Sequence, residues 1–153
     1  MNLVEWTLPS DYGTRIQTNG IVIHHSGPPA LTTWTNIDAY HRSLGWGGIG
    51  YNVGVDVDGG VTVFGELEDW RAHTFAHNST MIGVCFMAVD MPNAVQVAVG
   101  VEVVAWLRSI YGGVPMYRHS QLFNTSCPGN WYINTLEEPV SHPFDIPSEQ
   151  WTF

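Results

Sequence analysis

The sequence predicts an α/β fold in a single domain, with helices on the faces of a β-sheet. Short apolar runs and one segment of alternating apolar residues predict the strands. These runs are interleaved with two segments in which apolar residues recur at helical spacing. A chain of 153 residues, 44% of them hydrophobic, is long enough to enclose one substantial core but hardly two.

The first part of the chain contains one predicted strand and one predicted helix. Residues 1–19 are expected to be irregular, because proline, glycine and asparagine interrupt them. The apolar run 21–23 predicts a buried strand that ends at two adjacent histidines, His24 and His25. Residues 32–45 follow helical spacing, with a threonine available as N-cap and a glycine at the end.

The second part of the chain supplies the remaining strands and a longer helix. Residues 51–64 alternate around an Asp-Gly-Gly turn, which predicts a β-hairpin. The apolar run 82–89 predicts a further buried strand, and the pattern over 93–111 predicts a helix that a Gly-Gly pair ends. A short strand over 114–117 is then expected to lead into a polar loop, residues 118–130.

The charge of the chain excludes several classes of partner. Fourteen acidic residues face five basic ones, all arginine, and the formal net charge is -9. Such a balance argues against binding to nucleic acid and against docking on an anionic membrane. No apolar run approaches the roughly 20 residues that span a bilayer. The N-terminal residues carry no cationic segment, so we expect synthesis in the cytoplasm without a secretory signal.

The two cysteines lie in different settings and are not expected to form a disulfide. Cys85 belongs to an apolar run, where a thiol acts as a small hydrophobic side chain. Cys127 belongs to a polar loop. One cysteine in the core and one in a loop do not make a disulfide scaffold.

Three residues that follow predicted strand ends have the chemistry of a metal site: His24, His119 and Cys127. Two imidazoles and a thiolate suit Zn²⁺, and the soft thiolate argues against Mg²⁺ or Ca²⁺. Three protein ligands would leave one tetrahedral position open, which is the catalytic pattern. The alternative is that the histidines are hydrogen-bonded core residues and that the thiol is incidental. Spacing alone does not choose between a metal site and this alternative, nor does it show whether His24 or His25 faces the site.

The remaining histidines are expected to have different roles. His41 lies on the apolar side of its predicted helix and is expected to be structural. His73 is expected to contact substrate, whereas His77 and His142 are expected to be solvated.

Four aromatic side chains are candidates for stacking on a ligand. For each of them core packing is the expectation unless the side chain proves exposed beside a cleft. These residues are Trp34, Tyr40, Trp46 and Phe75.

Four segments, in order, resemble those of a known enzyme family. They are IVIHHSG, YHRSLGWGGIGYNVGVDVDGGV, AHTFAHNSTMIGVCF and RHSQLFNTSCPG. The family is that of zinc-dependent N-acetylmuramoyl-L-alanine amidases, which holds phage lysozyme-type endolysins, bacterial amidases and peptidoglycan recognition proteins. The resemblance extends from about residue 20 to residue 129.

The resemblance implies a fold and a metal site. The fold is a mixed central β-sheet flanked by helices, with a zinc cleft at one end of the sheet. The family's ligands match His24, His119 and Cys127, and the residue after the first ligand, here His25, is variable. The catalytic domain is expected to cover residues 1–138, and the prolines that follow predict a C-terminal tail over residues 139–153.

The resemblance also implies roles for residues beside the metal. Tyr51 matches a tyrosine described as catalytic in the phage enzymes. Thr125 matches a position where phage enzymes often carry lysine and catalytic recognition proteins carry threonine. His73, Asn78 and Trp46 are the expected substrate-binding residues. The general base is left open.

Two further points of the resemblance concern specificity and local structure. Met81 departs from the family, which commonly has serine there. In recognition proteins an arginine often contacts the additional carboxylate of diaminopimelate. The sequence leaves open which arginine could do so here: Arg42, Arg71 or Arg118.

The activity implied is hydrolysis of the amide between N-acetylmuramic acid and L-alanine in bacterial peptidoglycan. A phage or prophage endolysin is expected, acting as a monomer on the cell wall after release from the host cytoplasm. One alternative is a peptidoglycan-binding module without activity, although such members generally lack the cysteine found here as Cys127. The other is a cytoplasmic recycling amidase, whose relatives carry aspartate at that position.

Overall fold

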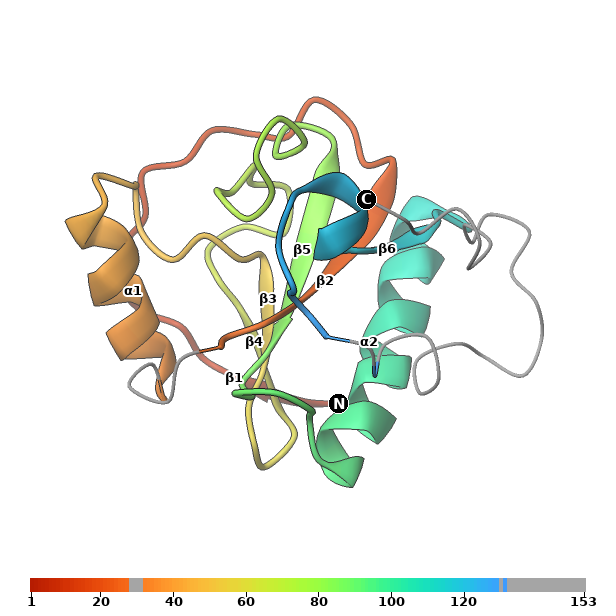
Figure 1. Cartoon of the computed structure of the whole chain (residues 1–153). Helices are drawn as coiled ribbons and strands as arrows, with labels where there is room; N and C mark the ends of the chain where they lie inside the picture. Colours follow the sequence, from red (N-terminus) through yellow and green to blue (C-terminus); the bar gives the residue numbers. More distant parts are fainter. Residues whose placement is uncertain (28–31, 130, 132–153) are drawn as a thin grey trace.

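A computed structural model describes residues 1–27, 32–129 and 131 as one domain built on a six-stranded sheet (Figure 1). The strand order is β1-β4-β3-β5-β2-β6. The strands are β1 (Asn2–Val4), β2 (Gly20–His25), β3 (Val53–Val55), β4 (Gly60–Val63), β5 (Met81–Phe86) and β6 (Met116–Arg118). The helices are α1 (Trp34–Ser43), α2 (Ala94–Tyr111) and α3 (His119–Leu122).

The sheet contains parallel and antiparallel pairs, as the resemblance implies. β2 pairs in parallel with β5 on one side and β6 on the other, and β5 also pairs in parallel with β3. The hairpin partners β3 and β4 are antiparallel. Strands β2 and β5 lie between two covered faces, and for this reason both are nearly continuous apolar runs.

One helix covers each face of the sheet, α1 on one side and α2 on the other (Figure 1). Trp34 and Ile37 of α1 belong to one buried cluster, and Val103 and Leu107 of α2 belong to a second. The Thr33 hydroxyl caps α1 by accepting from a backbone N–H at 3.1 Å. By length and composition alone, α2 could also cross a membrane, although here it packs on the sheet.

Three expectations about secondary structure are corrected. Residues 1–19 are not all irregular, because residues 2–4 form an edge strand parallel to β4, and all three are exposed, which leaves no burial pattern to read. The strand expected over 82–89 ends at Phe86. The expected loop 118–130 contains the short helix α3. The boundary at residue 138, the tail and His142 lie outside the described residues.

The parallel pairing of β2 and β6 positions the candidate site. Ile23 of β2 lies opposite Arg118 of β6, so the next residues, His24 and His119, emerge side by side at the same edge of the sheet. The chain then turns through α3 and returns to this edge at Cys127. The fold therefore brings together three residues that are up to 103 positions apart.

Candidate metal centre and its cleft

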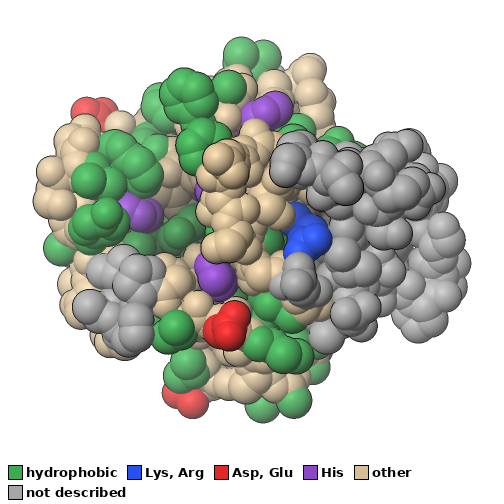
Figure 2. All heavy atoms as spheres, in the orientation of Figure 1, with side chains coloured by type: hydrophobic (Ala, Val, Ile, Leu, Met, Phe, Trp, Pro, Cys, Tyr) green, Lys and Arg blue, Asp and Glu red, His purple; other side chains and the backbone are tan. Residues whose placement is uncertain are grey.

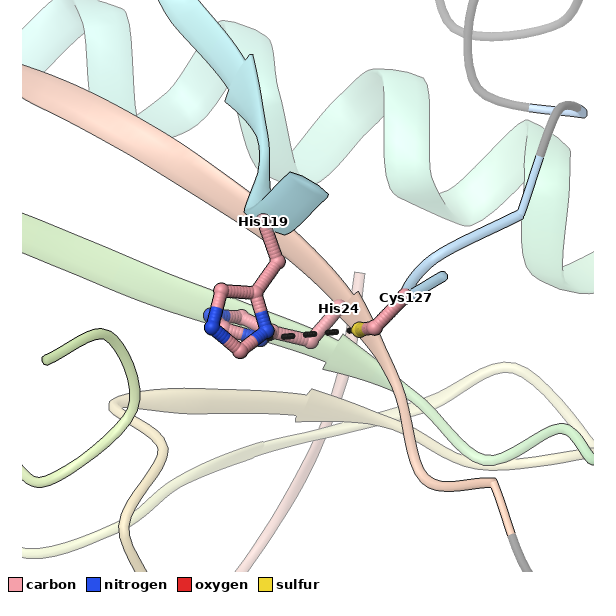
Figure 3. A group of neighbouring side chains, drawn as sticks. All are labelled: His24, His119 and Cys127. Carbon is pink, nitrogen blue, oxygen red and sulfur yellow. Dashed lines mark hydrogen bonds between the residues drawn. The ribbon is translucent and has the colours of Figure 1, made fainter. Parts of the chain in front are cut away.

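His24, His119 and Cys127 form a cluster whose potential ligand atoms all lie within 4.8 Å of one another. Figure 3 shows their side chains converging from β2, from the start of α3 and from the loop that follows. Cys127 Sγ lies 3.8 Å from His24 Nδ1, and the ring centroids of His24 and His119 are 4.5 Å apart. His24 is 1% exposed, whereas the other two are half-buried.

The donor set fits Zn²⁺. Bonds of about 2.0–2.3 Å in a tetrahedral site place neighbouring ligand atoms roughly 3.5 Å apart, so these atoms need only small adjustments. Two nitrogen donors and one sulfur donor match zinc in softness. Three ligands leave a fourth position for a water molecule or a substrate oxygen.

Burial sets the protonation of the three groups. It lowers the pKa of His24 well below its usual range, and the nearby His119 ring adds to this effect. Burial also lowers the pKa of His119 to about 4. Both imidazoles are therefore neutral near pH 7, which is the form that binds metal. Burial raises the pKa of the Cys127 thiol to about 12, so zinc must displace its proton.

Zinc binding is expected to release about one proton per ion between roughly pH 6 and pH 8. The proton comes from Cys127, whose raised pKa keeps the thiol protonated throughout this window. The histidines, with lowered pKa values, have already lost theirs. Zinc affinity should then rise about tenfold per pH unit. Calorimetry in buffers of different ionisation enthalpy measures the release, and an affinity independent of pH would contradict it.

His73 lies behind His24 and fixes which of its nitrogens faces the cluster. His73 Nε2 donates to the Met81 carbonyl at 3.0 Å, so its Nδ1 carries no proton and accepts. That Nδ1 lies 3.2 Å from His24 Nε2, which is therefore the donor. His24 Nδ1, the nitrogen that faces Cys127, is therefore unprotonated and free to bind a metal. The Thr74 hydroxyl lies 2.8 Å from the same His73 nitrogen and shares it.

Two neighbours hold His73 in this position. A Cβ at Gly83 of β5 would lie 2.5 Å from His73 Cγ, so the glycine makes room for the ring. The side-chain oxygen of Asn78 accepts from the backbone N–H groups of His73 and Thr74, at 3.0 and 2.8 Å. Both His73 and Asn78 thus have a contact that supports the site, while their expected contact with substrate stays a prediction.

Substitution of His73 by alanine is expected to raise the zinc dissociation constant about ten- to a hundredfold, the usual effect of losing a hydrogen bond to a ligand histidine. His73→Asn places an oxygen near the lost Nδ1 and should recover part of the affinity. His77→Ala, in the same turn but outside the cavity lining, is the control. Competition with a chelator measures the constants, and unchanged affinity in His73→Ala would disprove the role.

A cavity of about 260 Å³ opens above the cluster. Tyr51 lines it, with its ring centroid 5.2 Å from that of His24, and burial raises the pKa of its hydroxyl well above the usual value. Thr125 lines it as well, and its hydroxyl accepts from the Cys127 backbone N–H at 3.2 Å. Trp46, 38% exposed, forms part of the wall.

The structure separates the aromatic candidates. Trp34 is buried in the core, and Tyr40 is exposed but lines none of the cavities described here. Trp46 and Phe75 are exposed and line the cleft. Phe123 lines it too and was not predicted from the sequence, because a polar loop was expected where α3 forms.

His41 and His25 also border the cavity over the cluster. His41 has the expected structural role, since its Nδ1 accepts from the Gly50 backbone N–H at 2.8 Å. His25 contributes its backbone N–H, which donates to Cys127 Sγ at 3.4 Å, and its ring is not part of the ligand cluster.

The three arginines left open by the sequence differ in position. Arg42 borders a neighbouring cavity and pairs with Asp38 at 2.7 Å. Arg71 is fully buried, with its guanidinium 4.9 Å from the centre of the Tyr12 ring. Arg118 donates to the Gly129 carbonyl at 2.6 Å.

Comparison with known proteins gives consistent matches. Residues 13–130 match the family described as N-acetylmuramoyl-L-alanine amidase. Peptidoglycan-recognition protein SC2 of Drosophila melanogaster is 35% identical over 132 residues, covering 75% of this chain and 70% of that protein. The structure of the endolysin N-acetylmuramoyl-L-alanine amidase LysCS from Clostridium intestinale has a TM-score of 0.72 at 25% identity, covering 84% of this chain and 86% of that one.

Bumblebee PGRP-SA reaches a TM-score of 0.77 at 22% identity over 92% of this chain and 99% of that one, which shows the shared fold. The family match spans all three residues of the candidate metal cluster. With a 35% identical relative beside it, this match shows that the chain belongs to the N-acetylmuramoyl-L-alanine amidase family.

Proposed function

We propose that this chain is a zinc-dependent N-acetylmuramoyl-L-alanine amidase of the endolysin type. Its substrate is bacterial peptidoglycan, in which it hydrolyses the amide between the lactyl group of N-acetylmuramic acid and L-alanine. The observation that carries the proposal is the complete His24, His119 and Cys127 cluster at the floor of an open cavity. Membership of the family and the likeness to an endolysin amidase support it.

Each residue of the cavity has a role that follows from its chemistry. His24, His119 and Cys127 hold the metal. When bound, Zn²⁺ supplies Lewis-acid chemistry that polarises an amide carbonyl and activates water. The Tyr51 hydroxyl keeps its proton because burial raises its pKa, so it can donate a hydrogen bond to the carbonyl oxygen as negative charge develops there. Thr125 offers a neutral hydroxyl that can orient the substrate but cannot supply a positive charge.

Few side chains that line the cavity could transfer a proton during hydrolysis of the amide. Among the described residues that line the cavity, none is aspartate or glutamate. We assign proton transfer to Tyr51 and to solvent, and the Thr125 hydroxyl, whose oxygen accepts from the Cys127 backbone N–H, keeps its own proton for orienting the substrate.

A binding module without activity is the second candidate, favoured by the 35% identity to a recognition protein. The two are separated by incubating the protein with purified cell walls and measuring its zinc content, new amino termini and new reducing ends. An amidase holds zinc and releases amino termini without reducing ends, whereas a binder releases neither. Comparison of intact sacculi with soluble muropeptides separates an endolysin from a recycling amidase.

A further inference from the structure

Two side chains of α1 hold the backbone that leads into Tyr51. Asp38 Oδ1 accepts from the Ile49 backbone N–H at 2.8 Å. His41 Nδ1 accepts from the next backbone N–H, that of Gly50, at 2.8 Å. We propose that the buried Asp38 carboxylate is a positioning residue for the Tyr51 hydroxyl and acts through the Ile49 backbone. The proposal rests on the proposed function, and it adds a residue outside the described lining of the cavity over the metal cluster.

A buried positive charge holds the same residue at its carbonyl. Arg71 Nη1 donates to the Ile49 carbonyl at 2.8 Å, and Arg71 is fully buried. Arg71 Nη2 donates to Ser10 Oγ at 2.7 Å and to Asp69 Oδ2 at 3.0 Å, so the guanidinium is itself fixed. Ile49 thus lies between a buried carboxylate and a buried guanidinium, and its backbone can shift only if one of these contacts is lost.

Stability alone gives little reason to bury the Asp38 carboxylate. Asp38 is 4% exposed, and its second oxygen, Oδ2, accepts from Arg42 Nε at 2.7 Å. A buried ion pair is often no more stabilising than well-packed apolar side chains of similar volume, because the charges lose hydration. On the face drawn in Figure 2, hydrophobic side chains surround the histidines, so the carboxylate is not part of a charged surface around them. The contact with Ile49 gives Asp38 a role beyond stability.

The position of Ile49 is transmitted directly to Tyr51. Only Gly50 separates the two residues, and its bare backbone packs so closely that a Cβ there would meet the Ala72 carbonyl oxygen. The Tyr51 ring centroid lies 5.6 Å from that of His41, the second acceptor on α1. A displacement of about 1 Å at a catalytic group can cost up to a hundredfold in rate. A shift of the Ile49 backbone should therefore impair a hydroxyl that donates to a developing oxyanion.

The test compares Asp38 variants for kcat, KM and zinc content, with a soluble muramoyl peptide as substrate. Asp38→Ala should lower kcat about tenfold with KM and zinc content unchanged, because the hydroxyl is displaced and the metal is not. Asp38→Leu keeps the branching of aspartate without an acceptor, so it should give the same loss and replaces the alanine variant if that one does not fold.

The conservative variant Asp38→Asn separates the contact with Ile49 from the ion pair with Arg42. It should keep most of kcat, since its oxygen can still accept from the buried Ile49 N–H while the partly exposed Arg42 side chain turns to water. A loss in Asp38→Asn as large as that in Asp38→Ala would show that the ion pair carries the effect, and would overturn the proposal.

A double-mutant cycle separates positioning from a general loss of stability. In the Tyr51→Phe background, Asp38→Ala should lower kcat no further, because the hydroxyl that Asp38 positions is already absent. Asp56→Ala is the matched control, since Asp56 Oδ1 also accepts from a backbone N–H, that of Gly60 at 2.9 Å, but in the turn between β3 and β4. It should lower the melting temperature and leave kcat unchanged.

Four results would each overturn the proposal. They are a further tenfold loss in the Tyr51→Phe background, an equal loss of kcat in Asp56→Ala, loss of zinc in Asp38→Ala, and unchanged kcat in both Asp38→Ala and Asp38→Leu.

The position of Tyr51 can also be followed without activity. If the unmodified protein cleaves no muramoyl peptide, the proposed function fails, and NMR of protein with labelled tyrosine rings still tests the positioning. The Tyr51 ring signals, identified by their absence in Tyr51→Phe, should move in Asp38→Ala and Asp38→Leu but not in Asp56→Ala. The Ile49 amide should also exchange faster with solvent in the two Asp38 variants. Unchanged Tyr51 signals in those variants would refute the proposal.

Discussion

Replacing Cys127 by alanine is expected to abolish both zinc binding and amidase activity. The change leaves two imidazoles of a three-residue cluster and removes the only anionic ligand among its described members. Two neutral ligands hold zinc far more weakly than a set containing thiolate, because the thiolate offsets part of the metal charge. Zinc content, release of amino termini from purified walls and circular dichroism together separate loss of metal from loss of fold.

The other cysteine supplies the matched control. Cys85 is a free thiol buried in β5, and it is not a member of the metal cluster. Cys85→Ala should therefore keep one zinc per chain, at the cost of a small cavity in the core. If Cys127→Ala protein still released peptides from walls, or if Cys85→Ala lost its zinc, the assignment of the cysteine ligand would be wrong.

The edge of the sheet at which the metal cluster lies can be predicted from the sequence, because the ends of two strands determine it, although spacing alone leaves the choice between His24 and His25 open. An apolar run ending at His24 and a second one ending just before His119 can both be recognised, and parallel pairing places their ends at one edge of the sheet. Cys127 was a candidate from the sequence alone, but the resemblance was needed to choose it as a ligand, since a loop of eight residues can return in many directions. The clustering of the three residues in the structure agrees with what the motifs implied.

The surroundings of the cluster could not be predicted in the same way. His73 belongs to a polar turn, and no local pattern shows that its ring packs on Gly83 behind His24. Trp34 and Trp46 have the same side chain, yet one is in the core and the other is in the cleft wall. Such differences depend on which face of the sheet each segment covers, which is a tertiary property.

The expected effect of Tyr51→Phe is a fall in kcat of about a hundredfold with zinc content unchanged. A hundredfold corresponds to about 2.7 kcal/mol of transition-state stabilisation, within the range for one hydrogen-bond donor to a developing oxyanion. The phenyl ring preserves the packing beside His24, so only the hydroxyl is lost. This separates Tyr51 from the metal ligands, whose loss removes zinc as well.

The pH dependence of kcat provides a second test of the role of Tyr51. Because burial raises its pKa well above the usual value, the hydroxyl stays protonated in neutral and mildly alkaline solution, and its ionisation should not limit kcat there. Tyr117→Phe, on β6 and outside the cavity lining, is the control and should keep full activity. A Tyr51→Phe variant with unchanged kcat would show that the hydroxyl is not the donor to the oxyanion, and one purified without zinc would show that Tyr51 supports the metal site instead. In either case the Thr125 hydroxyl, on the same cavity wall, would be the next donor to test.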